Sequence, residues 1–361
     1  MPDTRSLDDP IDAIAARASA TDSHDGDLGP DIEALRAAGW LTACLPVKNG
    51  GNGWGSESAG AHAAFEALRK LGRANLSVAR LYEGHVNAVK LIALHADGAL
   101  REDAFERIRD GRLLGVWGAD TRDAPVAFRE SGGKLHLSGS KRFASGLGWV
   151  DHAIVVVNRD DGAHMVLVPV GDHARGDVSS WGVAGMRATR SGSYDFDGIA
   201  LPASHRFGRA GAYMTEPHFE GGIWRYCAAH LGAAEAIHAE LRTRLEDMGR
   251  AADPVQTKRL VEGVIALETM RLWILRAARA VEADGADPKA AALSLLAREV
   301  TEREALRVVA LAEKALGMAA YNEGSTVERI ARDLRLYLRQ AAPDAKLLRA
   351  ASMIEQRADA L

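Results

Sequence analysis

A stretch of β-character between two helical regions constrains this fold more than any other feature of the sequence. It runs from Gly115 to Phe207, is punctuated by glycines and contains few strong helix formers. Within it, the alternating apolar runs at 152–157 and 164–169 are joined by the polar segment 158–162, which is typical of a β-hairpin. The sequence therefore predicts a β-domain inserted between helical domains, with boundaries at 1–112, 113–210 and 211–361.

The flanking regions carry the apolar spacing of helices. Residues 59–71 and 76–94 repeat apolar side chains at helical intervals before the β-domain. After it, the Asp-Pro pairs at 253–254 and 287–288 are typical helix starts, and the short connections favour an up-down four-helix bundle. A cluster of glycine and alanine at 231–236 predicts close helix packing at the middle of the first bundle helix.

Two segments of the β-domain carry a resemblance to a known family. Residues 138–146 read SGSKRFASG and residues 185–202 read GMRATRSGSYDFDGIALP; later, residues 327–335 read VERIARDLR. All three resemble segments of the acyl-CoA dehydrogenase superfamily of flavoproteins. The resemblance implies an α+β fold with an N-terminal helical domain, a middle β-barrel-like domain and a C-terminal four-helix bundle. It also implies FAD at the junction of β-domain and bundle, with FMN as the alternative, and a homodimer or homotetramer formed through the bundle.

The same resemblance assigns candidate cofactor contacts. Ser145 matches a Thr or Ser whose hydroxyl lies beside the flavin ring and tunes it, although a serine before glycine is also ordinary in a turn. Gln256 matches a glutamine at the start of a bundle helix, in a family region that binds the dinucleotide of a neighbouring subunit. The full set of candidate cofactor-binding residues is Trp117, Asp120, Thr121, Phe143, Ala144, Ser145 and Gln256.

The catalytic carboxylate of the dehydrogenases has no obvious counterpart. The usual position of the glutamate that removes the α-proton corresponds to Ala341, and the alternative position on the first bundle helix corresponds to Gly222. Neither side chain accepts a proton. Glu220 is the best replacement, and the alternative is a glutamate that merely stabilises the start of a helix.

A second branch of the superfamily offers a different activity. Flavin monooxygenases of the dibenzothiophene type use reduced flavin and oxygen and need no α-proton base. They carry a serine near the flavin and histidines in the pocket, which match Ser145 and His85, while His85 also fits a core histidine. The hypotheses are thus an acyl-CoA dehydrogenase, a flavin monooxygenase or oxidase acting on a non-CoA molecule, and a non-catalytic homologue serving as a partner subunit.

Composition and charge limit the partners, the location and the metal sites that we expect for this protein. The net charge is -4, with no basic face that would indicate a nucleic-acid partner. Two cysteines, the lack of an apolar leader or membrane-spanning run, and the lack of paired-histidine metal motifs favour a cytoplasmic protein without a metal site. The resemblance implies a small-molecule substrate, an acyl-CoA or related acyl compound in the first hypothesis, and an electron-transfer flavoprotein or a flavin reductase as redox partner.

Overall fold

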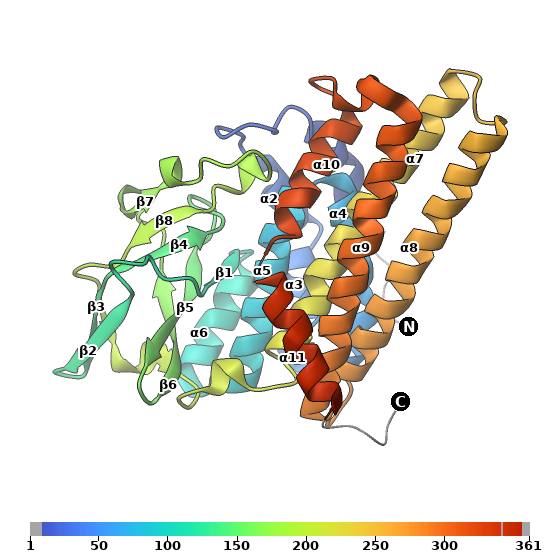
Figure 1. The fold of residues 1–361 in the computed structure, drawn as a ribbon. Helices are drawn as coiled ribbons and strands as arrows, with labels where there is room; N and C mark the ends of the chain where they lie inside the picture. The colour runs from blue at the N-terminus through green and yellow to red at the C-terminus, as the bar shows by residue number, and fades with distance from the viewer. Residues whose placement is uncertain (1–8, 341, 356–361) are drawn as a thin grey trace.

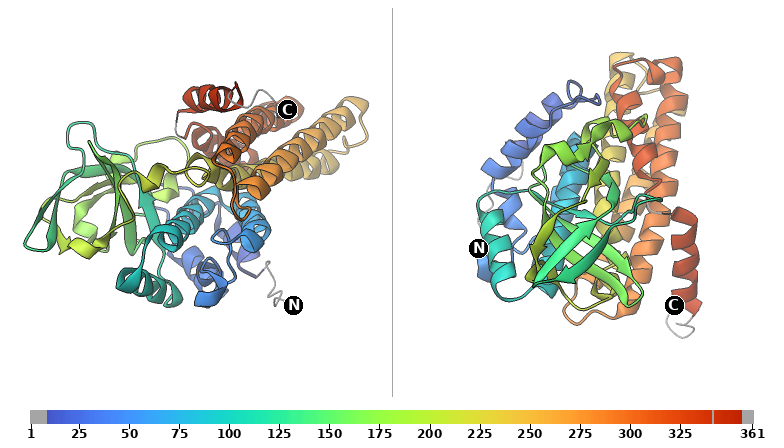
Figure 2. Two further views of the ribbon diagram at one scale, coloured as in Figure 1. Left: turned by 90° about the horizontal axis from the view of Figure 1, so that it is seen from below. Right: turned by 90° about the vertical axis from the view of Figure 1, so that its left-hand side faces the viewer.

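The computed structural model describes residues 9–340 and 342–355. It places a β-domain at one end, with the N-terminal helices and the long bundle helices side by side behind it (Figures 1 and 2). One hydrophobic core runs through all three parts. The predicted fold class is confirmed, and the corresponding α-helices and strands lie at 9–109, 114–207 and 224–355.

Six α-helices lie in the described N-terminal part of the chain. Asn75 begins the longest of them, because its side chain accepts hydrogen bonds from the N–H groups of Ser77 and Val78. The helices are α1 (Asp9–Arg17), α2 (Gly29–Ala37), α3 (Trp40–Ala43), α4 (Ala61–Ala74), α5 (Leu76–His95) and α6 (Gly98–Arg109).

The β-domain is built from three small sheets rather than from one continuous barrel. A four-stranded sheet has the order β1-β5-β6-β10, in which β1 pairs with β5 in parallel and the others are antiparallel. The predicted hairpin is present as β5 and β6, paired from His152–Pro169 to Arg159–Gly162. The other sheets have the orders β2-β3-β9 and β4-β8-β7. The strands are β1 (Leu114–Trp117), β2 (Ala127–Ser131), β3 (Lys134–Ser138), β4 (Ser140–Ala144), β5 (His152–Arg159), β6 (Gly162–Pro169), β7 (Gly176–Asp177), β8 (Gly192–Asp195), β9 (Ala200–Pro202) and β10 (Arg206–Phe207).

The C-terminal part is a bundle of long helices, as predicted. Asp253 begins α8, where it accepts hydrogen bonds from the N–H groups of Val255 and Gln256, and Pro254 occupies the first helical position. The final helix packs on the outside, against α9. The helices are α7 (Trp224–Asp247), α8 (Pro254–Val281), α9 (Ala291–Leu316), α10 (Thr326–Tyr337) and α11 (Pro343–Glu355).

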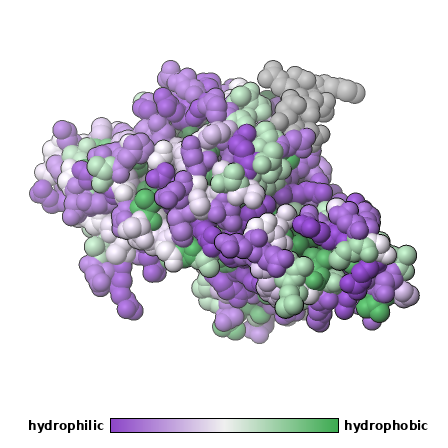
Figure 3. Space-filling view, turned by 90° about the horizontal axis from the view of Figure 1, so that it is seen from above, coloured by the Kyte–Doolittle hydropathy of each residue, from purple (hydrophilic) through white to green (hydrophobic). Residues whose placement is uncertain are grey.

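The surface seen from above is hydrophilic over most of its area, and apolar residues gather in patches, one of them on the side where α7 and α8 lie (Figure 3). No helix in the described ranges is long and apolar enough to cross a membrane.

A buried aspartate joins the β-domain to the bundle. The carboxylate of Asp333 in α10 accepts a hydrogen bond of 2.6 Å from the N–H group of Met186. Close by, a Cβ on Gly185 would lie 2.6 Å from the carbonyl oxygen of Arg332, so this loop and α10 touch through their backbones. Burial raises the pKa of Asp333 to about 6. The junction therefore contains a carboxylate that resists ionisation.

We expect the Asp333→Asn variant to be more stable than the wild type above pH 6. A carboxyl with a pKa of 3.8 in the unfolded chain and about 6 in the folded protein costs nothing well below pH 3.8, where it is protonated in both states. The cost grows as pH rises through that window and is full above it, at about 3 kcal/mol. Urea unfolding at pH 4 and pH 7.5 measures the difference, with exposed Asp123→Asn as the control. Equal gains at both pH values would refute this explanation.

Candidate functional site

A cavity of about 260 Å³ lies where α5, β1 and the start of α7 meet. Four of its buried wall residues are charged or polar, and they come from a helix before the β-domain and a helix after it. They are Glu83 and Lys90 of α5, and Arg225 and Tyr226 of α7.

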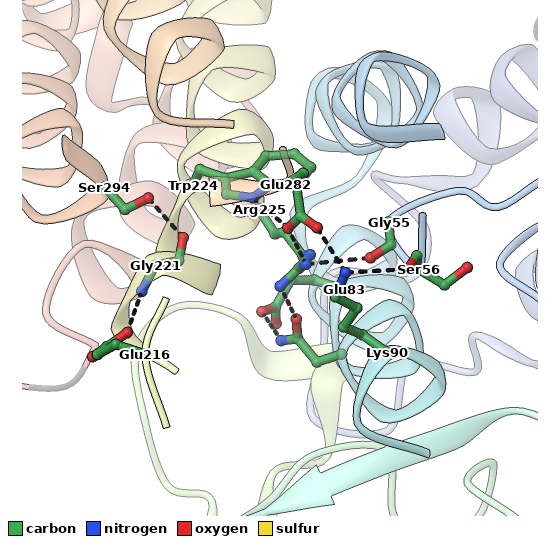
Figure 4. A network of polar contacts seen from close by, with 11 residues as sticks. Gly55, Ser56, Glu83, Lys90, Glu216, Gly221, Trp224, Arg225, Glu282 and Ser294 are labelled. Atoms are coloured by element: carbon green, nitrogen blue, oxygen red, sulfur yellow. Dashed lines mark hydrogen bonds and ion pairs between the residues drawn. The ribbon is translucent and has the colours of Figure 1, made fainter. Parts of the chain in front are cut away.

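Three buried side chains converge on the carboxylate of Glu282, at the end of α8 (Figure 4). Lys90 donates to it at 2.9 Å, Arg225 at 2.5 Å and the indole N–H of Trp224 at 3.1 Å. Burial by itself raises the pKa of Glu282, but Arg225 and Lys90 more than offset burial, so the pKa lies below its ordinary value. This cluster holds Lys90 and Arg225 in fixed positions at the cavity wall.

The guanidinium of Arg225 is only partly used by the protein. Its Nη1 donates to the Asn87 side chain at 3.1 Å, and its Nη2 also donates to the Gly55 carbonyl at 3.3 Å. Its Nε has no partner within the described ranges. A guanidinium has five N–H donors, so Arg225 retains donors for another group.

Glu83 lies at the centre of a second polar cluster. Its carboxylate accepts hydrogen bonds from Arg80 at 2.7 Å and from Asn87. Burial raises the pKa of Tyr213 to about 12, and the Glu83 charge acts in the same direction. The same two causes raise the pKa of Tyr226 and Tyr337. These tyrosines therefore stay protonated near neutral pH.

Several buried polar atoms beside this cluster lack a partner in the part of the chain that the structure describes. They are the hydroxyls of Tyr226 and Tyr337 and both ring nitrogens of His230. The His230 ring lies 4.5 Å from the Tyr337 ring, and burial lowers the pKa of His230 to about 3. Unsatisfied buried polar groups are costly and uncommon. Their concentration next to the cavity indicates a site that accommodates a polar ligand or ordered water.

His218 adds a neutral imidazole to the cavity wall. Burial lowers its pKa to about 4, and the positive charge of Lys90 acts in the same direction. Its Nδ1 also lacks a partner among the described residues.

The structure brings one of the two predicted catalytic residues to this cavity. Glu220 lines it, and the carboxylate pairs with Lys346 at 3.4 Å and with Arg349 at 3.5 Å, both from α11. Gly222, the position of the alternative base, also lines the cavity. Ala341, the usual position, lies outside the described residues. The role of Glu220 as a base stays a prediction.

His85 does not line this cavity. Its ring is fully buried; Nε2 lies 3.0 Å from the Leu41 carbonyl, and Nδ1 accepts a hydrogen bond of 3.1 Å from the N–H group of Leu114. Burial lowers the pKa of His85 to about 4, so the ring is neutral. His85 therefore connects α5 to α3 and β1. These contacts are those of a core histidine, the alternative interpretation of this residue from the sequence.

The candidate cofactor residues fall into three groups. Phe143, Ala144 and Ser145 lie together at the end of β4. The next residue, Gly146, packs against Leu81 of α5, since a Cβ on Gly146 would lie 3.1 Å from the Leu81 side chain. Ser145 is 8% exposed, and its hydroxyl accepts a hydrogen bond of 2.8 Å from Ser191. Phe143 has a left-handed backbone with φ of 56° and a half-exposed ring.

The second group is occupied by contacts inside the β-domain. The indole N–H of Trp117 donates to the Ser145 carbonyl at 3.2 Å. Asp120 pairs at 2.6 Å with the buried Lys141, and the hydroxyl of Thr121 accepts from Ser140 at 2.9 Å. Trp117 thus supports the Ser145 segment, and direct cofactor contacts of this group stay a prediction.

Gln256 lies far from the cavity within one chain. It is in the first turn of α8, which has 28 residues and so spans about 42 Å, while Glu282 follows the other end. The side chain is buried and accepts from Arg259 at 3.1 Å. Its predicted contact with a cofactor therefore requires a neighbouring subunit.

Comparison with known proteins identifies the fold. The sequence model for the acyl-CoA dehydrogenase C-terminal domain matches residues 211–338. The structure of butyryl-CoA dehydrogenase from Megasphaera elsdenii superposes with a TM-score of 0.83, covering 97% of this chain and 96% of that chain at 19% identity. The chain has the acyl-CoA dehydrogenase fold. The family resemblance read from the sequence is confirmed.

Two curated relatives of this acyl-CoA dehydrogenase-fold protein carry monooxygenase names. A probable FMNH2-dependent monooxygenase, SfnC, from Pseudomonas putida is 25% identical over 295 residues, which are 75% of this chain and 71% of that protein. Dibenzothiophene monooxygenase from Rhodococcus qingshengii is 27% identical over 212 residues, 55% of this chain. That match spans 49% of the dibenzothiophene enzyme, about half its length.

The sequence did not point to several residues that form the cavity wall. Glu83 lies on the apolar helix α5 and belongs to none of the segments that carry the family resemblance. Arg225 and Tyr226 lie on a helix with no motif around them. The sequence signal for these two residues is a cluster of basic and aromatic side chains at the start of a helix. Such clusters are common in proteins, so this one did not indicate a site.

Proposed function

We propose that this protein is a monooxygenase that uses reduced flavin and acts on a small polar molecule rather than on an acyl-CoA. The observation that carries the proposal is the charged wall of the cavity. The names of the curated relatives, SfnC and dibenzothiophene monooxygenase, support the same class.

The cavity offers an aliphatic acyl chain a mixed wall. An acyl chain gains affinity by leaving water for apolar surroundings; Leu91, Phe219 and Ile223 provide such a surface here, but Glu83, Lys90 and Arg225 stand beside them. Covering such groups with hydrocarbon costs free energy unless their hydrogen bonds are replaced. At about 260 Å³ the cavity is also slightly below the range of ~300–1,000 Å³ that is common for ligand pockets.

The missing base agrees with oxygen chemistry. Neither position at which the dehydrogenases carry the catalytic glutamate, Ala341 or Gly222, has a carboxylate in this sequence. A monooxygenase that uses reduced flavin and oxygen does not remove an α-proton. The proposed reaction therefore requires no replacement for that residue.

The segment at the end of β4 fits a flavin ring. Ser145 presents a slightly exposed hydroxyl that accepts from Ser191, so its own proton is free to donate to a ring nitrogen. The left-handed backbone of Phe143 is unusual for an aromatic residue and places its ring at the surface beside Trp181, at 6.0 Å. Reduced flavin, when bound, would supply the electrons that activate oxygen. We propose FMN rather than FAD, because the nearby curated relative is named for FMNH2.

Three further features belong to this proposal. A separate flavin reductase would supply the reduced cofactor.

A homo-oligomer would form through α8, which exposes Val261, Val264, Ile265 and Leu272 along one side, and light scattering would measure its mass. A cytoplasmic location agrees with Cys44 and Cys227 being buried free thiols, and cell fractionation would test it.

Flavin binding and oxygen consumption test the function directly. We expect the purified protein to bind reduced FMN and to increase oxygen consumption in the presence of NADH and a flavin reductase, and anaerobic butyryl-CoA not to bleach bound flavin. The Ser145→Ala variant should weaken flavin binding by about 10-fold, the scale of one hydrogen bond. Exposed Ser131→Ala is the matched control.

Two results would overturn the proposal. Bleaching of bound FAD by an acyl-CoA would establish a dehydrogenase. A protein that takes up neither FMN nor FAD would favour the non-catalytic homologue.

A further inference from the structure

The charges around the cavity do not balance. Lys90 and Arg225 share a single carboxylate, Glu282, at 2.9 and 2.5 Å. Arg80 and Glu83 form a neutral pair at 2.7 Å. His218 is neutral because burial and Lys90 lower its pKa to about 4. The Lys90–Arg225–Glu282 cluster therefore leaves one positive charge beside the cavity.

The charged groups of the outer wall add nothing to this excess. Lys346 and Arg349 of α11 both face Glu220, and the Glu216 carboxylate lies behind it, accepting from the N–H groups of Glu220 and Gly221. Two cations and two carboxylates balance there. A buried unpaired charge is costly, so the excess at Arg225 is a reason for an anion to bind.

Arg225 is positioned to receive that anion. Its side chain is 3% exposed and is fixed by Glu282, Gly55 and Asn87. Only one of the two Nη1 protons is used, by Asn87, and Nε is unpaired within the described ranges. An anion would accept the hydrogen bond from Nη1, which lies beside the cavity-lining Gly222, without the cost of ordering the arginine first.

Gly222 keeps the approach to this arginine open. A Cβ at Gly222 would lie 2.8 Å from the Arg225 Nη1, closer than real contacts allow. The next residue along α7, Tyr226, also lines the cavity, and its hydroxyl has no partner in the described part of the chain. The site thus combines one unused Nη1 proton, a hydroxyl without a partner in the described ranges and a glycine beside Nη1.

We propose that the cavity takes a small organic oxyanion, a carboxylate or a sulfur oxyacid, whose oxygens accept hydrogen bonds from Arg225 and from the hydroxyl of Tyr226. This anion would be the substrate of the monooxygenase proposed above, and only its role as a substrate rests on that proposed function. The anion site itself depends on no flavin.

Calorimetric titration of the purified flavin-free protein tests the anion site. The probes are butanoate, propane-1-sulfonate and the neutral isostere butanamide. We expect one or both anions to bind at least about 10-fold more tightly than butanamide, with affinity falling as salt is added. Comparing the two anions distinguishes a carboxylate site from one for sulfur oxyacids.

Three variants assign the binding to the named residues. Arg225→Met should weaken anion binding by about 30-fold or more, because a charged hydrogen-bonded partner is lost. It leaves Lys90 and Glu282 as a balanced pair, which preserves the folded protein. Gly222→Ala should reduce binding without changing any charge, and Tyr226→Phe should reduce it by about 10-fold. The control is Arg242→Met, an exposed arginine of the same helix.

The outcomes separate this inference from the proposed function. Equal binding of butanamide and the anions, or unchanged affinity in folded Arg225→Met and Gly222→Ala proteins, would refute the anion site whatever the flavin experiments show. Selective anion binding by a protein that takes up no flavin would support the site and refute the monooxygenase.

Discussion

Replacing Gly232 by alanine is expected to destabilise the protein by about 3 kcal/mol or more. Gly232 lies in the middle of α7, where a Cβ would be 1.9 Å from the carbonyl oxygen of Arg69 in α4. The contact is mutual, since a Cβ on Gly72 of α4 would be 2.0 Å from the Ala229 carbonyl oxygen. Both obstacles are backbone atoms, so the helices must move apart. Urea unfolding measures the loss.

The effect of Gly232→Ala opposes the intrinsic preference of a helix. In an unobstructed helix interior, alanine is more stable than glycine by about 1 kcal/mol. Gly84 of α5 provides the control, because a Cβ there would have only the side-chain end of Arg80 nearby, at 3.4 Å. We expect Gly84→Ala to be neutral or slightly stabilising. If Gly232→Ala behaves like Gly84→Ala, α4 and α7 do not touch through their backbones.

The close packing at Gly232 could be predicted because its signal is local. The glycine and alanine cluster at 231–236 lies within one helix and directly indicates a close approach. The same holds for the β-hairpin and for the starts of α8 and the 3₁₀ turn before α9, where an Asp-Pro pair supplies both the cap and the first helical residue. Each of these signals is contained in a few consecutive residues.

The cavity wall could not be predicted in this way. Glu83 and Arg225 line the cavity from two different helices, and Glu282, which holds Arg225, follows the end of a third; no two of them are close in the sequence. Their chemistry arises from how α5, α7 and α8 pack against one another. For His85 the sequence left two interpretations, a pocket histidine from the monooxygenase resemblance and a core histidine from its apolar helix, and in the structure backbone groups occupy both ring nitrogens.

The residues of the cavity wall are also the reason why we propose a monooxygenase. The family resemblance alone suggests an acyl-CoA dehydrogenase. The fold positions a cavity between α5, the β-domain and the bundle whatever the chemistry. The residues that line it determine what can bind. Here they combine charged with apolar side chains, and glycine stands at a position where the resemblance places a dehydrogenase base, so the fold alone does not determine the activity.

Replacing Glu282 by glutamine is expected to cost about 3 kcal/mol or more. The carboxylate is 1% exposed and receives hydrogen bonds from Lys90, Arg225 and Trp224. Glutamine preserves the shape and leaves two buried cations with no counter-charge. The control is Glu268→Gln on the same helix, where an exposed pair with Arg271 should contribute about 1 kcal/mol or less. Urea unfolding at pH 7 compares the two.

The pH dependence and a double variant identify charge as the cause. Because the folded-state pKa of Glu282 is lowered, its contribution is complete above the unfolded pKa, near 4.5, and is lost as pH falls through the folded value. The gap between wild type and Glu282→Gln should therefore be constant above about pH 5 and shrink in acid. Adding Lys90→Met to Glu282→Gln removes one unpaired cation and should restore part of the stability. A double variant less stable than Glu282→Gln alone would mean that Lys90 contributes by packing, and that the carboxylate does not hold the cluster together by charge.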